Sequence, residues 1–136
     1  MSGDYTLVHG SPRDPLREYI TTAEVARENL AVLTTTHGLH GHTHVPVAFA
    51  LDGDLAVVHT AGDGRSFTAA RRPSLINPGS VGQPRDGDPR ACYMVLDPEA
   101  QTVTWHRVAY DIRAVQTAMR EVGLPARLAE RLAHGA

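Results

Sequence analysis

The sequence contains no lysine, because all thirteen of its basic side chains are arginine. This absence excludes Schiff-base chemistry and the Walker-type phosphate loop, since both need the lysine amine. A compositional bias of the source explains the missing lysine most simply. Arginine can nonetheless bind phosphate, because its planar guanidinium grips phosphate oxygens bidentately.

Cysteine is scarce, and long apolar runs and excess charge of one sign are missing. Cys92 is the single cysteine, so disulfide frameworks and four-cysteine zinc sites are excluded. No apolar segment approaches membrane-spanning length, and the N-terminus has no basic stretch followed by an apolar run, which predicts a soluble cytoplasmic protein without a membrane partner. The net charge of −2 gives no support to nucleic acid as a partner.

The length of 136 residues fits one ordinary domain, and we expect residues 1–136 to form a single unit. Apolar runs and turn signals predict mostly strands as far as residue 108. Asp-Gly at positions 52 and 53 and Asp-Pro-Glu at positions 97–99 predict two hairpins. The predicted strands are Tyr5–Val8, a strand ending near His40, Val45–Leu51, Leu55–Thr60, Ser74–Ile76, Ala91–Leu96 and Thr102–Val108.

Helical spacing of apolar residues and helix-capping signals predict the remaining elements. Thr22 and Asp111 are expected N-caps, Gly123 a stop and Pro125 a start. The predicted helices are a short helix with a turn in Asp14–Ile20, then Ala23–Leu33, Ile112–Val122 and Ala126–Ala133. The fold class is therefore α/β in the broad α+β sense, with a mixed sheet followed by C-terminal helices.

Three histidines in two short stretches are the most informative feature. His42 and His44 lie in Gly41-His42-Thr43-His44, and His9 follows the first predicted strand. Residues two apart in an extended strand project to the same face, so His42 and His44 can present two imidazoles to one side of a strand end. This arrangement suits a pair of metal ions.

These stretches resemble the calcineurin-like metallophosphoesterases, specifically a bacterial subgroup. The Gly-His-x-His stretch, the isolated His9-Gly10 and the loop in Leu75–Arg85 occur in the order found in that family. The match runs from Tyr5 to about Asp111 and corresponds to the C-terminal half of the family's domain. The resemblance implies a portion of a four-layer α/β/β/α sandwich with metal ions at strand ends.

The resemblance also implies a two-metal hydrolase. His9 and His42 would bind one divalent ion and His44 the other, with Mn, Fe or Zn as the metal. Two ions roughly 3.5–4 Å apart would activate a hydroxide that attacks a phosphomonoester or phosphodiester. Arg13 and Arg85 are candidates to neutralise the substrate phosphate.

The remaining histidines have a simpler interpretation as surface or hydrogen-bonded residues: His37, His59, His106 and His134. His40 is expected behind the metal ligands rather than among them. For Asn77, Gly79 and Ser80, a tight turn is the simplest interpretation. A functional alternative is that this turn supports the histidine loop and offers amides to a phosphate oxygen.

Several ligand motifs of the family are missing from the sequence. It has no Asp-x-His, no Gly-Asp-x-x-Asp and no Gly-Asn-His-Asp, so the bridging carboxylate and the acid for the leaving group are absent. We therefore expect the chain to be the C-terminal part of a longer enzyme, an isolated domain of it or one half of a split enzyme. Self-association or binding to a complementary N-terminal half would cover the strand edges left open.

Two other hypotheses for the function remain besides a phosphoesterase. The chain could be a non-catalytic module of the same fold that binds metal or acts in assembly. A small β-barrel metal site or a barrel amidohydrolase fits poorly: the first wants a glutamate soon after His44, and the second needs roughly 250 residues.

Overall fold

The larger of two β-sheets holds five strands, and its topology positions the histidines. The computed structural model describes residues 5–136, so residues 1–4 of the predicted domain lie outside the described part. The strand order is β1 (Tyr5–Leu7), β2 (His37–Leu39), β6 (Ser74–Asn77), β3 (Val47–Asp52) and β4 (Leu55–Thr60).

The directions of these strands bring several strand ends to one edge of the sheet. β1, β2 and β6 are parallel neighbours, whereas β3 runs antiparallel to both β6 and β4. The carboxyl ends of β1, β2, β6 and β4 therefore share one edge with the start of β3. We call this edge the histidine edge, because the chain leaves β1 toward His9 and β2 toward His42 and His44.

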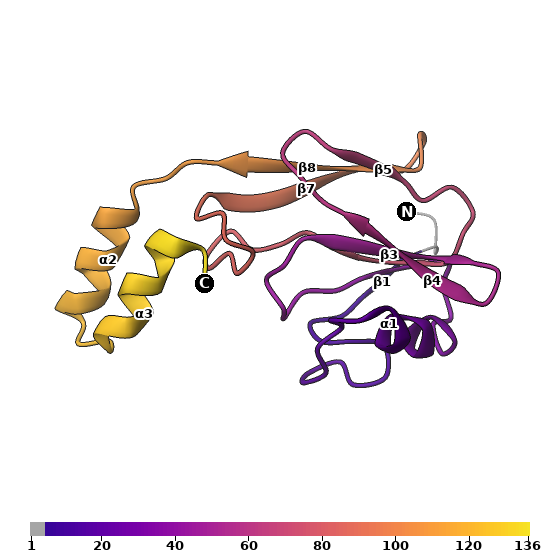
Figure 1. The fold of residues 1–136 in the computed structure, drawn as a ribbon, viewed down its shortest axis with the longest axis horizontal. Helices are drawn as coiled ribbons and strands as arrows, with labels where there is room; N and C mark the ends of the chain where they lie inside the picture. The colour runs from indigo at the N-terminus through magenta and orange to yellow at the C-terminus, as the bar shows by residue number, and fades with distance from the viewer. Residues whose placement is uncertain (1–4) are drawn as a thin grey trace.

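The smaller sheet is antiparallel and contains β5 (Ser66–Thr68), β8 (Thr102–Val108) and β7 (Ala91–Asp97), in that order. The β7–β8 hairpin turns where it was predicted. In this turn the Asp97 carboxylate accepts hydrogen bonds from the amides of Glu99 and Ala100. In Figure 1 this sheet lies above the five-stranded sheet. Its outer face exposes Tyr93 and Val95.

Buried apolar side chains from both sheets fill the space between them. Trp105 couples the two sheets directly, since its indole Nε1 donates to the carbonyl of Asn77 across 2.9 Å. This bond fixes the end of β6 from the opposite sheet. The cluster consists of Ala48, Ala50, Phe67, Ala69, Ile76, Cys92, Val103 and Trp105.

Helix α1 (Ala23–Leu30) covers the other face of the five-stranded sheet. Thr22 caps it as predicted, because its Oγ1 accepts a hydrogen bond from the amide of Val25. Leu30 packs there in a second apolar cluster with Phe49 and Leu75 of the sheet. Helix α1 and the two sheets thus form three layers of a sandwich.

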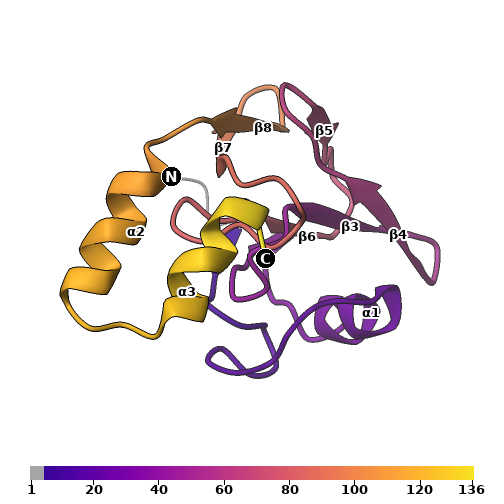
Figure 2. The same cartoon turned by 60° about the vertical axis from the view of Figure 1, so that its left-hand side comes forward.

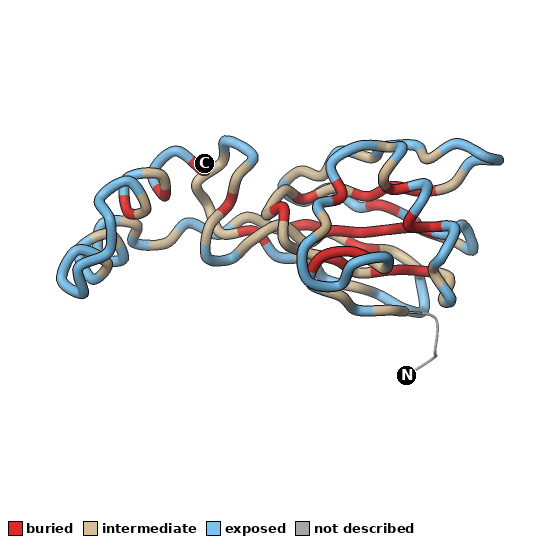
Figure 3. Tube along the Cα trace, turned by 90° about the horizontal axis from the view of Figure 1, so that it is seen from below, coloured by how far each residue is buried: buried red, intermediate tan, exposed pale blue. Residues whose placement is uncertain are grey.

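The last two α-helices, α2 (Ile112–Glu121) and α3 (Ala126–Glu130), form a pair beside the sheets and not over them (Figures 1 and 2). A 3₁₀ helix, Arg131–His134, follows. Figure 3 shows that burial concentrates in the sandwich and that this helical pair is mostly exposed. In the part of the chain that the structure describes, no helix has the length and apolarity to cross a membrane.

The mixed sheet, both hairpins and the terminal helices confirm the predicted α+β class, but several local predictions were wrong. Asp14–Ile20 forms a turn without a helix, because the Asp14 carboxylate accepts from the amides of Leu16 and Arg17 and closes the turn. The helix predicted to reach Leu33 ends at Leu30. The β5 strand was not predicted.

Gly79 lies in the predicted tight turn after β6, where its φ of +86° disfavours other residues. A Cβ there would also lie 2.8 Å from the Cβ and Sγ of Cys92, whereas at Gly87, with a φ of +85°, it would meet nothing within 4 Å. The two glycines thus share a positive φ and differ in how crowded their surroundings are.

We expect Gly87→Ala to cost about 1–2 kcal/mol, the usual cost of a left-handed alanine. Gly79→Ala should cost about 1–3 kcal/mol more, because the extra methyl overpacks the core. Urea unfolding of both variants checks this. Equal losses would contradict the close packing of Gly79 on Cys92.

Candidate metal centre

The loops after β1 and β2 are joined at the histidine edge. Beyond the last paired residues of these strands, the amide of Val8 donates to the carbonyl of Leu39 at 3.0 Å. The amide of Gly41 then donates to the carbonyl of His9, also at 3.0 Å. These two bonds continue the parallel pairing into the loops and bring His9 beside the stretch that carries His42.

The rings of His9 and His42 converge. His9 Nε2 lies 2.8 Å from His42 Nδ1, and the ring centroids are 4.6 Å apart in an edge-on arrangement. Two imidazoles bound to one ion at about 2.0–2.1 Å hold their nitrogens about 3 Å apart when they occupy adjacent positions. The observed spacing therefore fits a shared divalent ion, and it also fits a hydrogen bond between two neutral rings.

The backbone that carries His42 and His44 is not an extended strand, so the geometry predicted for this pair was wrong. Both residues have left-handed backbones, with φ of +62° and +61°. They lie in a bent loop after β2, and the period of two does not apply to them. His42 is instead oriented by Tyr19, whose ring stacks on it with centroids 3.9 Å apart and planes inclined by 23°.

His44 is oriented by a backbone carbonyl. Its Nδ1 lies 2.8 Å from the carbonyl oxygen of Gln83, which can only accept, so Nδ1 carries the proton. The lone pair of the neutral ring is therefore on Nε2, and such a bond is typical of metal-binding histidines.

Electrostatics also favours the neutral ring of His44. Burial lowers its pKa below the ordinary value, and the nearby charges of Arg85, His42 and His9 act in the same direction. The hydrogen bond to Gln83 opposes this shift. Neutral imidazole is the form that binds metals.

The turn after β6 supports the histidine loop, which was the functional alternative predicted for Asn77, Gly79 and Ser80. The side-chain amide of Asn77 donates to the carbonyl of Gly41 at 2.8 Å and to Oγ1 of Thr43 at 3.0 Å. Its oxygen accepts from the amide of Gly79 at 2.9 Å. Asn77 is fully buried, so these bonds join the tight turn to the loop.

His40 lies behind this loop and is 2% exposed. Burial lowers its pKa to about 4, so the ring is neutral near neutral pH. Asn77 Nδ2 lies 3.4 Å from His40 Nδ1.

The two candidate phosphate-binding arginines have different surroundings. Arg13 forms ion pairs with Glu18 and Glu28, which compensate its charge. Arg85 donates to the side-chain oxygen of Gln83 at 2.9 Å, and its backbone amide donates to the carbonyl of His44 at 3.3 Å. Within residues 5–136, no ion pair to a carboxylate involves Arg85. Its positive charge is therefore available beside His44.

The other histidines lie elsewhere in the fold. His37 is buried in β2 beside Tyr5, His106 stacks on Tyr93 of the smaller sheet, and His134 is in the terminal 3₁₀ helix. His59 is on β4 at the far side of the five-stranded sheet. Across residues 5–136 no three histidine, cysteine, aspartate or glutamate side chains form a group that could hold a metal ion. The described part of the chain thus offers a pair of imidazoles with His44 nearby, and no carboxylate joins them.

A comparison with solved structures identifies the fold. The chain superposes over its whole length on a metallophosphoesterase from Sphaerobacter thermophilus, with a TM-score of 0.94 and 47% sequence identity. The chain has the calcineurin-like metallophosphoesterase fold. It corresponds to the C-terminal half of the Sphaerobacter metallophosphoesterase and covers 58% of that chain.

Two further comparisons match the chain to parts of other proteins. A hypothetical protein from Pyrococcus horikoshii superposes on 97% of the chain with a TM-score of 0.71 and 19% identity, and 46% of that protein is covered. An uncharacterized protein of Methanocaldococcus jannaschii is 38% identical over 92 residues, which are 68% of this chain and 36% of that protein. No protein-family model matches the chain. The chain thus spans between about a third and about three fifths of these relatives.

The side chains that hold His42 and the loop after His9 were not predicted from the sequence. Tyr19 and Asn29 were not singled out, because their roles depend on contacts with residues 11 to 23 positions away. The carbonyl of Gln83 leaves no signal at all, since every residue has one. Glu18 was also missed, although it accepts hydrogen bonds from Arg13, Ser11 and Asn29 and so fixes the loop after His9.

The pH dependence of stability tests this role of Glu18. Hydrogen bonds from Arg13, then Ser11, lower its pKa to about 2 from an ordinary value of 4.5. Its stabilisation is therefore fully present above about pH 4.5 and is lost as the pH falls toward 2. Glu18→Gln should lower the urea midpoint at pH 7, and its difference from the wild type should shrink between pH 4.5 and pH 3.

Glu121→Gln, at an exposed end of α2, is the matched control and should leave the midpoint unchanged across this range. A Glu18→Gln deficit that stays constant from pH 7 to pH 3 would show that the carboxylate charge does not stabilise the loop.

Proposed function

We propose that this chain supplies part of the dinuclear metal centre of a phosphoesterase that hydrolyses phosphomonoesters or phosphodiesters. The observation that carries the proposal is the 2.8 Å approach of His9 Nε2 to His42 Nδ1 at the histidine edge. The lone pair on Nε2 of His44 and the similarity to the Sphaerobacter metallophosphoesterase support it. We also propose that residues 1–136 act as one domain and that the protein is cytoplasmic, as the sequence predicts.

In this proposal each side chain has a defined role. His9 and His42 hold one divalent ion and His44 the other, with Mn, Fe or Zn as the metal. The ions supply Lewis-acid activation of water and neutralise phosphoryl charge. Tyr19 and the carbonyl of Gln83 fix the rings before the ions bind, which limits the reorganisation needed.

Substrate binding is assigned to arginine. Arg85 lies beside His44 without a carboxylate partner in the described residues, so its guanidinium can neutralise a phosphate ester. Arg13 is bound to Glu18 and Glu28. In this proposal Arg13 reaches a substrate only by giving up those partners, and Arg85 carries the larger share.

The remaining metal ligands come from another polypeptide segment in our proposal. Three imidazoles carry no negative charge that would offset the repulsion between two divalent ions. β1 lies at the edge of the five-stranded sheet, and Leu7 on it is 74% exposed. A complementary N-terminal half or a second copy of the chain could pair with this strand edge.

A second candidate function is a non-catalytic metal-binding or assembly module of the same fold. The specific observation in its favour is that no three potential ligand side chains form a metal-binding group in the described part. Such a module would bind one ion weakly through His9 and His42 and would not turn over a phosphate ester.

Metal binding and hydrolysis together test the proposal. Calorimetric titration with Mn²⁺ should show that His42→Ala and His44→Ala each weaken metal binding. Changes to residues that only orient a ligand weaken it about 10–100-fold, and loss of a ligand itself should weaken it more. Exposed His134→Ala should leave the affinity unchanged, which makes it the matched control. Equal affinity in all three variants would remove the ligand assignment.

The same protein loaded with Mn²⁺ is then assayed with bis-p-nitrophenyl phosphate. Turnover that falls in step with metal occupancy in the His42 and His44 variants supports a phosphoesterase. Metal binding without turnover supports the non-catalytic module, or a centre that needs a further segment.

The exposed β1 strand at the side of the larger sheet also predicts self-association. We expect sedimentation velocity at micromolar concentration to show a dimer or larger species, and Leu7→Lys to shift it toward monomer, because a charged side chain blunts an exposed edge. Val122→Lys, which adds the same charge at an exposed site after α2, is the control. A strictly monomeric, well-folded wild type would argue against a second copy at this edge.

A further inference from the structure

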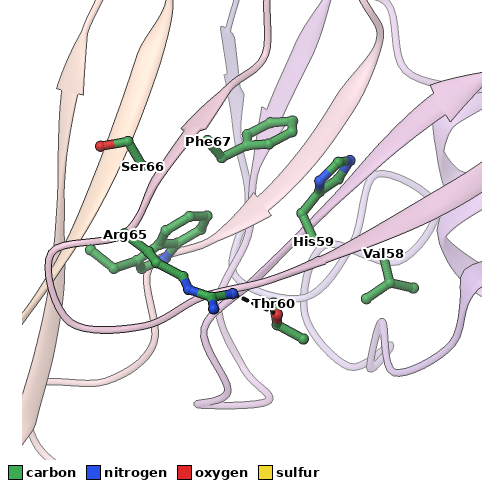
Figure 4. A pocket seen from close by; sticks show the side chains of 7 residues that line it. Val58, His59, Thr60, Arg65, Ser66 and Phe67 are labelled. Atoms are coloured by element: carbon green, nitrogen blue, oxygen red, sulfur yellow. Dashed lines mark hydrogen bonds between the residues drawn. The ribbon is translucent and has the colours of Figure 1, made fainter.

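A polar pocket lies beside β4, lined by residues other than those of the candidate metal centre. It has a volume of about 260 Å³ and opens between β4 of the larger sheet and β5 of the smaller one (Figure 4). The ring of Phe67 and the indole of Trp105 contribute its apolar walls, and both are buried. The lining residues are Val58, His59, Thr60, Arg65, Ser66, Phe67 and Trp105.

Arg65 gives this pocket a positive charge without a counter-charge. Its Nη1 donates to Oγ1 of Thr60 at 3.3 Å, the contact drawn in Figure 4. No carboxylate forms an ion pair with it in residues 5–136. In contrast, Arg90 and Arg107 are each paired with aspartates. A guanidinium with one neutral partner keeps most of its donors free for an anion.

His59 adds an unused polar atom to the same pocket. Its Nε2 is buried and has no hydrogen-bond partner among the described residues. The ring is held against Phe67, with centroids 4.6 Å apart and planes inclined by 45°. A buried nitrogen without a partner is unfavourable, so a polar ligand that the ring turns to meet gains by satisfying it.

We propose that this pocket binds a small oxyanion of the phosphate class, as inorganic phosphate or as the phosphate group of an ester. The free guanidinium of Arg65 excludes a cation and favours an anion. The hydroxyl of Thr60 and the imidazole of His59 can each donate or accept, which suits an oxyanion that still carries a proton. The volume of the pocket, about 260 Å³, is just below the usual range of about 300–1,000 Å³ for ligand sites and suits a small ion.

This site is distinct from the candidate metal centre, although both lie at the histidine edge. Thr60, the last residue of β4, is opposite Val47 at the start of β3. β4 and β2 are three strand positions apart in the order β2-β6-β3-β4. Adjacent strands are about 4.8 Å apart, which separates the two strand ends by roughly 14 Å. None of the residues that line the pocket belongs to the histidine loop.

Titration of the chain with inorganic phosphate in EDTA, followed by amide ¹H–¹⁵N chemical shifts, tests the proposal. We expect saturable shifts at Thr60, Arg65 and Ser66 in the low millimolar range. Arg65→Gln should weaken binding by about tenfold or more, as expected for loss of a charge-assisted hydrogen bond. His59→Phe keeps a ring against Phe67, removes the nitrogen and should also weaken binding.

Controls separate this site from the metal centre and from general charge effects. Arg113→Gln removes an exposed arginine on α2 and should leave the phosphate affinity unchanged. His42→Ala should also leave it unchanged, so loss of the proposed metal centre would not affect this result. Phenyl phosphate in a parallel titration distinguishes the two sources: tighter binding than phosphate indicates an ester, and equal binding indicates the free ion.

Three results would overturn the proposal. The first is no saturable shift at Thr60, Arg65 and Ser66. The second is an equal loss of affinity in the Arg65→Gln and Arg113→Gln variants, which would indicate general charge attraction. The third is phosphate binding that disappears in His42→Ala, because it would place the anion at the histidine loop.

Discussion

The parallel pairing of β1 with β2 is the constraint on which the candidate site depends. His9 and His42 are 33 positions apart in the sequence, yet their rings approach to 2.8 Å because the two strands end at the same edge of one sheet. The bond from Gly41 to the carbonyl of His9 carries this pairing one step into the loops. A shift of β1 by one residue along β2 would turn its side chains to the opposite face and separate the two rings.

The histidine loop is held in one conformation by parts of the molecule that have no catalytic chemistry of their own. Left-handed backbones at His42 and His44 cost about 1–2 kcal/mol each, so the surroundings must compensate for them. The side chain of buried Asn77 donates hydrogen bonds to the loop, and the carbonyl of Asn77 accepts one from Trp105 of the other sheet. The packing of the two sheets thereby reaches the candidate ligands, and a ligand set arranged in advance binds an ion with less reorganisation.

Local signals in the sequence predicted most of the fold, whereas the detail of the site depends on long-range contacts. Thr22 as a helix cap and the Asp-Gly and Asp-Pro-Glu turns act over a few residues, so the helix and hairpins they mark were found. The β5 strand has only three residues and exists through pairing with β8, which no local pattern reveals. The ion pairs of Arg13 and the stacking of Tyr19 on His42 also join separate segments, so no local pattern reveals them.

The most direct test of the central claim is anomalous diffraction from crystals of the chain soaked in Mn²⁺. The account predicts an anomalous peak within bonding distance of His9 Nε2 and His42 Nδ1, with both rings retaining the orientation described here. A crystal that binds Mn²⁺ elsewhere, or one in which His9 and His42 point away from each other, would contradict it.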